Sequence, residues 1–130
     1  MTTTDVLAAS QQELGLYQEL WAVYDRLAAG LAEADTDATA LTDHGQRAAA
    51  VTAALRDLAV TLAPHRLAPE TVHEDVTAVW RASATLAAAT AEANRRLQAA
   101  AQARRNRVAT QLGQIATGAA AGNRYRQAVR

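Results

Sequence analysis

The sequence predicts an all-α protein: an elongated antiparallel three-helix bundle, coiled-coil-like, with one long C-terminal helix and a short flexible tail. Apolar residues recur at the 3-4 spacing of helices, and no stretch shows the alternation typical of a strand. Half of the residues are hydrophobic, and 35 of them are alanine. Because alanine favours helix strongly but buries little area, we expect a thin core and modest stability.

The first helix is expected over about residues 5–34. Its apolar stripe includes three aromatic residues at helical spacing, Tyr17, Trp21 and Tyr24. We interpret these side chains as core that supplies the bulk the alanines lack. Anchoring of a helix from a partner protein is the alternative.

The second and third helices are expected over about residues 38–63 and 69–117. The second should end before Pro64, because a proline disfavours helical geometry in the residue that precedes it. The third can begin with Pro69 in its first turn. Its apolar residues keep one phase from Val72 to Ile115. We therefore predict a single helical domain over residues 1–117, followed by a flexible basic tail, 118–130, which begins at Gly118.

Charge is distributed unevenly along a chain whose formal net charge is zero. Residues 1–75 hold twelve acids and four arginines, a net charge of −8, whereas residues 76–130 hold one acid and nine arginines, a net charge of +8. The simplest expectation is that the two halves pack side by side and neutralise each other. The alternative is a basic arm that binds an acidic partner.

No constellation in the sequence predicts catalysis, a metal site or a cofactor. The chain has no cysteine, no glycine-rich phosphate loop and no set of residues spaced as a catalytic triad. Glu70 and His73 match half of a di-iron motif, which needs a second such pair and two more glutamates. We therefore predict that the protein is not an enzyme.

Three small polar residues, Ser83, Thr90 and Asn94, fall on the apolar arc of the third helix. They fit either a thin core, where they bond to backbone, or a polar strip in a groove that binds a partner. The start of the chain has no secretory signal, and no apolar run is long enough to cross a bilayer. We expect a cytoplasmic protein without membrane insertion.

Several segments together resemble the FlgN-type flagellar type III export chaperones, with the FliT-type group as a near neighbour. The resemblance covers residues 14–125. It includes the opening "LYQELWAVYDRLAAGLAEADTDATALT", then "QRAAAVTAALRDL", then "AEANRRLQAAAQARRNRVATQLGQIATG", and a short tail that contains a tyrosine.

The resemblance implies a cytosolic chaperone that keeps hook–filament junction proteins soluble and delivers them to the type III export gate. A helical segment of the client would lie on the apolar arc of the third helix. The residues expected to bind it are Leu97, Val108, Leu112 and Ile115.

By the same resemblance, docking to the cytoplasmic domain of the export gate falls to the tail. Tyr125 would be the anchor, and its neighbours Arg124 and Arg126 would steer the tail toward an acidic surface. Two alternatives of other classes remain: a self-associating coiled-coil protein, and a helical domain that binds nucleic acid through its arginines. The nucleic-acid alternative is the less favoured, and a homodimer is left open.

Overall fold

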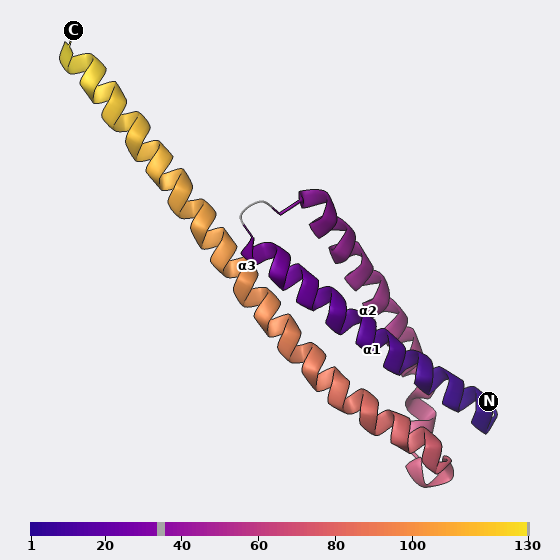
Figure 1. The fold of residues 1–130 in the computed structure, drawn as a ribbon. Helices are drawn as coiled ribbons and strands as arrows, with labels where there is room; N and C mark the ends of the chain where they lie inside the picture. The colour runs from indigo at the N-terminus through magenta and orange to yellow at the C-terminus, as the bar shows by residue number, and fades with distance from the viewer. Residues whose placement is uncertain (34–35, 130) are drawn as a thin grey trace.

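The computed structural model describes residues 1–33 and 36–129, and it confirms the all-α bundle (Figure 1). Three helices, α1 (Thr3–Ala32), α2 (Ala38–Arg66) and α3 (Glu74–Val129), are joined by a loop and by a short 3-10 helix, η1 (Pro69–Thr71). The described residues contain no strand. Consecutive helices run antiparallel, so α1 and α3 point in the same direction.

Helix α1 lies between the other two helices and packs along both (Figure 1). The main core cluster joins α1 and α2 through residues such as Leu20, Val23 and Val51, with Leu97 of α3 packed against it. A second cluster, Val6, Leu62 and Val76, joins all three helices near the N-terminus of α1. The core thus follows the faces of α1.

The helix boundaries at the first two helices differ somewhat from those predicted. Thr2 and Asp5 form a reciprocal capping box at the start of α1, whose predicted end at residue 34 lies outside the described residues. The predicted end of the second helix at residue 63 is wrong, because α2 continues through Pro64 to Arg66. Pro64 lies in the last turn of α2, and only two helical residues follow it. Its missing amide hydrogen therefore removes one backbone hydrogen bond close to the end of the helix.

The predicted start of the third helix at Pro69 is also wrong. Pro69 opens only the short η1, because Val72 is extended, with φ −99° and ψ 150°. Helix α3 begins at Glu74, and the Nδ1 atom of His73 accepts a hydrogen bond from the Asp75 amide at 3.1 Å. His73 therefore caps the start of α3.

The C-terminal end departs most from the prediction of a helix end at residue 117 and a flexible tail. α3 continues through Gly118 and Gly122 to Val129, and only Arg130 of the predicted tail lies outside the described residues. Each glycine costs about 1 kcal/mol relative to alanine in a helix, but the alanines between them favour it. Arg107 donates a hydrogen bond to the Leu31 carbonyl near the end of α1, so residues 108–129, about 33 Å of helix, project beyond the bundle.

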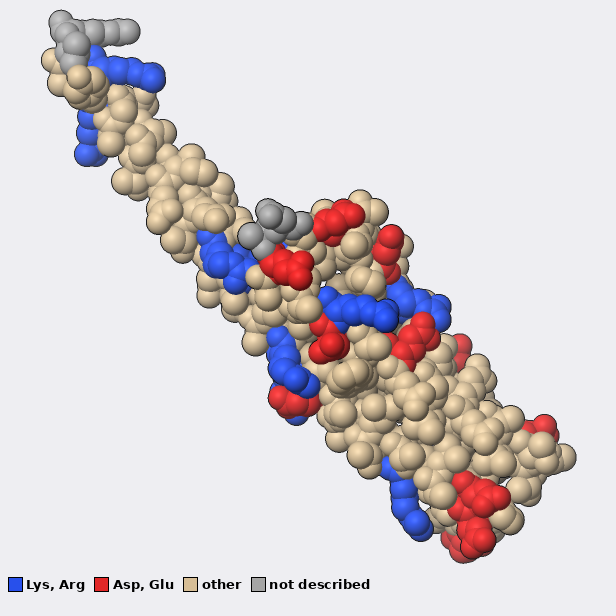
Figure 2. Space-filling model, viewed as in Figure 1, with Lys and Arg blue, Asp and Glu red and all other residues tan. Residues whose placement is uncertain are grey.

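The expected neutralisation between the two halves of the chain is not found in the described residues. Their ion pairs, Glu19–Arg47, Glu13–Arg66 and Glu92–Arg95, each join residues of the same half. The reason is geometric: acids of α1 face arginines of α2, and the distal arginines of α3 lie beyond the bundle (Figure 2). Among the described residues, no ion pair therefore joins a charge of one half to a charge of the other.

The surface ion pair between Glu19 and Arg47 changes the pKa of the Glu19 carboxyl. The Arg47 guanidinium beside Glu19 lowers the pKa of that carboxyl, so the stability it contributes is present above the ordinary glutamate pKa and is lost as the pH falls through the lowered value. We expect Arg47→Met to return the pKa of Glu19 toward 4.5, measured by NMR titration of the side-chain carboxyl. Arg81→Met, on another helix, is the control. An unchanged Glu19 pKa in Arg47→Met would contradict the assignment.

Candidate helix-binding groove

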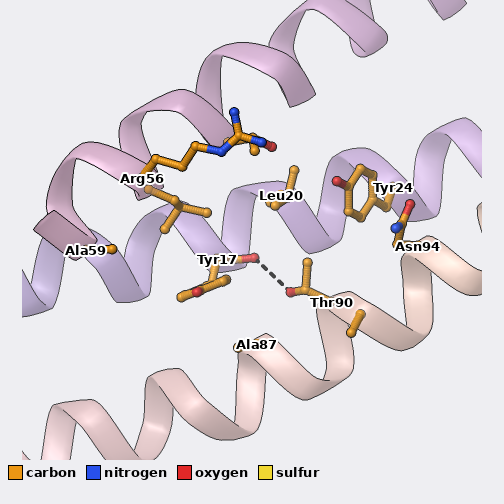
Figure 3. A pocket seen from close by; sticks show the side chains of 11 residues that line it. Tyr17, Leu20, Tyr24, Arg56, Ala59, Ala87, Thr90 and Asn94 are labelled. Carbon is orange, nitrogen blue, oxygen red and sulfur yellow. Dashed lines mark hydrogen bonds between the residues drawn. The ribbon is translucent and has the colours of Figure 1, made fainter.

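A groove lies between α2 and α3, because α1 separates these two outer helices (Figure 3). Residues of α1 form the floor of the groove. Its main part has a volume of about 400 Å³. We call it the α2–α3 groove. The residues that line it are Tyr17, Leu20, Tyr24, Thr52, Leu55, Arg56, Ala59, Ala87, Thr90, Ala91 and Asn94.

The floor and the walls of the groove differ in character. Tyr17, Leu20 and Tyr24 of α1 form an apolar floor, while alanines such as Ala59 and Ala87 line the walls. Tyr17 and Tyr24 also pack against the core, as predicted for the aromatic stripe, whereas Trp21 is exposed. Small wall residues let another backbone approach closely, so the groove suits a helix.

The polar residues on the arc of α3 divide between the two predicted roles. The Thr90 hydroxyl is buried and donates a hydrogen bond to the Leu86 carbonyl at 2.8 Å, with the Tyr17 carbonyl 3.5 Å away. Asn94 instead lines the groove. Thr90 therefore behaves as a core residue that bonds to backbone, and Asn94 belongs to a polar strip in the groove.

The groove continues toward the N-terminal end of the bundle. A second hollow of about 240 Å³ shares Tyr17, Ala59 and Ala87 with the first and is also lined by Trp80 and Ser83. The Ser83 hydroxyl oxygen is buried and has no hydrogen-bond partner.

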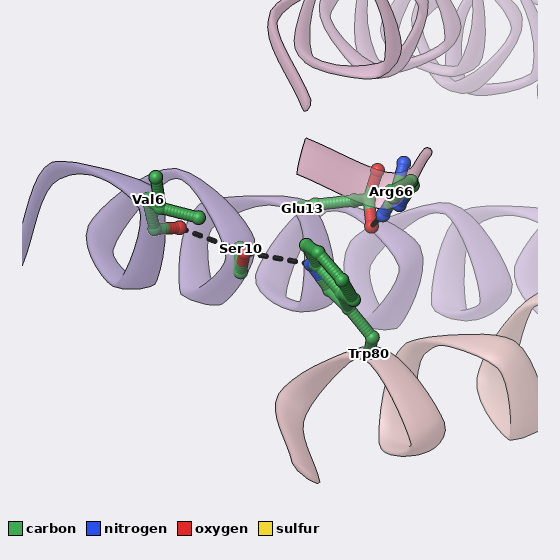
Figure 4. Close-up of polar contacts among 5 residues, drawn as sticks. All are labelled: Val6, Ser10, Glu13, Arg66 and Trp80. Carbon is green, nitrogen blue, oxygen red and sulfur yellow. Dashed lines mark hydrogen bonds and ion pairs between the residues drawn. The ribbon is translucent and has the colours of Figure 1, made fainter. Parts of the chain in front are cut away.

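A polar cluster fixes the shape of that end (Figure 4). The Trp80 ring nitrogen donates to the Ser10 hydroxyl at 2.9 Å, and Ser10 donates to the Val6 carbonyl at 2.7 Å. Arg66 pairs with the buried Glu13 and places its guanidinium carbon 5.4 Å from the Trp80 ring centroid. The cluster ties all three helices together, so the groove is preformed.

The dimensions of the groove match a short helix. The two hollows together extend over residues 52–66 of α2 and 80–94 of α3. With a rise of about 1.5 Å per residue, these ranges give the groove a length of about 20 Å, which is enough for about four turns of a docked helix.

The residues predicted to bind a client do not form one site. Leu97 packs against the main core. The other three lie on one face of the projecting part of α3 and are exposed: Val108 by 46%, Leu112 by 60% and Ile115 by 68%. The structure thus gathers these three and separates Leu97 from them.

The residues predicted to dock to the export gate lie on the last turns of α3. Tyr125 is 72% exposed. Successive residues of a helix point about 100° apart, so the side chains of Arg124, Tyr125 and Arg126 diverge around the axis.

The α2 wall and the alanines Ala59 and Ala87 were not identified from the sequence. The available signals were two polar residues on the apolar arc of the third helix, Ser83 and Asn94, and the aromatic residues Tyr17 and Tyr24. For both groups, binding of a partner was one of two interpretations. Alanine gave no signal because it occurs along the whole chain and is mostly exposed in the described residues, so its presence does not mark a particular face.

Comparison of the chain with protein-family models, curated proteins and solved structures finds no match. Within the described residues, no helix combines the length and the apolar character that crossing a membrane demands. No three acidic or histidine residues of the described part come together as a metal site.

Proposed function

We propose that this protein is a helix-binding chaperone whose α2–α3 groove accepts an amphipathic helical segment of a client protein. The observation that carries the proposal is the continuous groove itself, with an apolar floor, several alanines among the larger side chains of its walls, and room for about four helical turns. Helix-in-groove recognition uses this combination, because the apolar face of the client replaces water on the floor.

The chemistry of the groove suggests what a client helix carries. Apolar side chains at helical spacing would cover Tyr17, Leu20 and Tyr24. Each Å² of apolar surface removed from water in this way favours burial by about 25 cal/mol. A polar side chain at the edge of this stripe would meet Arg56 and Asn94, which line the groove. Recognition would thus depend on an apolar stripe with one polar position.

The resemblance to flagellar export chaperones supplies a class of client within this proposal. The clients would be hook–filament junction proteins, bound in the cytoplasm through a terminal helix and delivered to the export gate. Tyr125, Arg124 and Arg126 would contact the gate from the tip of α3. Their exposure and their distance along α3 from the groove support a division between a client site and a delivery site.

A bulky side chain in the groove wall tests the client site. We expect Ala87→Trp to lower affinity at least tenfold for labelled peptides from the terminal helices of hook–filament junction proteins, measured by fluorescence anisotropy. The indole would fill space that the client helix needs. Ala88→Trp, the same change at an exposed neighbour outside the groove, is the matched control.

The anisotropy experiment separates the function from the choice of client. Binding of a generic amphipathic helix, sensitive to Ala87→Trp, without binding of junction segments would retain the groove and remove the flagellar clients. Equal effects of the two tryptophan substitutions would place the client elsewhere. Absence of binding by every helical peptide would refute the chaperone proposal.

The delivery site has its own test. We expect Tyr125→Ala to weaken binding to the isolated cytoplasmic domain of an export gate, measured by biolayer interferometry, and to leave peptide binding unchanged. Tyr125→Phe, which keeps the ring, should retain most of the gate affinity if ring packing provides the contact. Equal gate binding by all three proteins would remove Tyr125 from the proposal.

A further inference from the structure

The projecting part of α3 carries an apolar face that no other element covers in the described residues. This distal stripe consists of Val108, Leu112, Ile115, Ala119 and Gly122. At about 100° per residue, all five positions lie within about 40° of Val108 around the helix. The same face is buried lower on α3, at Val76, Ser83, Thr90 and Ala93. The stripe therefore continues a packing face beyond the end of its partner helix.

Charge disfavours one possible cover for the distal stripe, namely the distal stripe of a second copy. Residues 98–129 contain arginines but no acid: Arg104, Arg105, Arg107, Arg124 and Arg126. Pairing two distal stripes with each other would therefore place arginines beside arginines. Residues 1–75, which include α1, α2, η1 and the first two residues of α3, carry a net charge of −8 that no ion pair to the second half offsets in the described residues.

We infer that the distal stripe docks in the α2–α3 groove of a second copy of this chain, in an antiparallel two-fold dimer. Each subunit supplies one stripe and one groove, so the assembly closes with both faces covered. The inference does not rest on the proposed chaperone function, but the two share one site: a client helix would have to displace the distal stripe of the second copy from the α2–α3 groove.

The dimensions and the residue sizes of the two surfaces match. The stripe from Val108 to Gly122 extends about 21 Å, and the groove about 20 Å. Small residues lie on both sides, Ala119 and Gly122 on the stripe and Ala84 and Ala87 on the groove wall. Such pairs let two helices approach closely and exclude water.

An antiparallel arrangement also matches the ends of the molecule. From Glu74 to Arg126, α3 covers about 78 Å, so antiparallel alignment brings the basic tip of one copy beside the start of α3 in the other. Exposed Glu70, Glu74 and Asp75 lie at that start, and acids gather at that end of the molecule in Figure 2. Tyr125 points about 100° away from Arg126, so it stays outside the interface.

The first test is the oligomeric state of the full chain. We expect a dimer by sedimentation equilibrium and a monomer for Leu112→Glu/Ile115→Glu, with at least a tenfold rise in the dissociation constant. The control Gln114→Glu/Thr117→Glu adds the same charge on other faces of the same turns and should remain dimeric. All four positions are exposed, so circular dichroism should show equal helicity. A monomeric wild type, or equal association of both variants, would overturn the inference.

A charge exchange tests the antiparallel geometry. Arg124→Glu/Arg126→Glu and Glu70→Arg/Glu74→Arg should each weaken self-association, and an equimolar mixture of the two variants should restore it. Failure of the mixture to associate, with both variants folded, would overturn the antiparallel arrangement.

Cross-linking keeps the inference testable if the Glu70→Arg/Glu74→Arg variant loses helicity. The chain has no cysteine, so Ala87→Cys and Ile115→Cys each create a single thiol. A short bismaleimide should join an Ala87→Cys chain to an Ile115→Cys chain when the two are mixed. Cross-links found only between two Ile115→Cys chains would show that the stripes pair with each other, and the inference would be wrong.

Discussion

Replacing Leu62 with alanine is expected to lower the free energy of unfolding by about 2–5 kcal/mol, the usual cost of truncating a fully buried leucine. Leu62 has no exposed surface and packs with Val6 and Val76, so it joins α2 to both other helices. Few large side chains are fully buried in this alanine-rich protein. The surrounding residues therefore have little bulk with which to fill the cavity that the substitution leaves.

Urea unfolding followed by circular dichroism measures this effect. Small domains have a free energy of unfolding of about 5–15 kcal/mol, so this substitution would remove a large fraction of the stability. Val60→Ala is the control, because Val60 lies on the same helix with 76% of its surface exposed, and we expect a change within about 0.5 kcal/mol. Similar effects of the two substitutions would mean that Leu62 does not hold the helices together.

The fold class followed from local pattern, because the spacing of apolar residues predicts both a helix and its buried face. Tyr17 and Tyr24 lie on the stripe expected from the sequence and pack against the core. The ends of the helices were less predictable. Pro64 and Gly118 disfavour helix locally, but neighbouring residues on both sides favour it, and the sum of many small preferences decides.

The groove could not be predicted because it depends on the distance between helices. Residues such as Ala59 and Ala87 are distant in sequence and meet only because α1 holds α2 and α3 apart. A hydrophobic pattern shows which face of each helix is buried, but not whether three such faces close completely. The unpaired Ser83 hydroxyl likewise becomes informative only when its surroundings are known.

The buried ion pair beside the groove is a further feature that sequence reasoning missed. Glu13 belongs to α1, and Arg66 lies beyond Pro64, where no helix was expected. The extra helical residues after Pro64 bring the guanidinium over both Glu13 and the Trp80 ring. Because the second helix was predicted to end at residue 63, the contact of Arg66 with residues of α1 and α3 could not be foreseen.

Removing the arginine from this pair is expected to have the second large effect on stability. In Arg66→Met the Glu13 side chain, 4% exposed, would remain buried without its partner. Breaking a buried pair costs about 3–5 kcal/mol, and we expect the lower end because the Arg66 side chain is 35% exposed. The loss of the contact with Trp80 should also loosen one end of the groove.

A second substitution separates the charge from the packing. If the cost comes from an unpaired buried carboxylate, Glu13→Gln combined with Arg66→Met should regain most of the lost stability, because the amide carries no charge. Urea unfolding of the single and double variants gives the coupling free energy, with Arg81→Met as an exposed control. Additive losses would show instead that Arg66 acts through its packing on Trp80. In that case, Trp80 fluorescence should change as much in the double variant as in Arg66→Met.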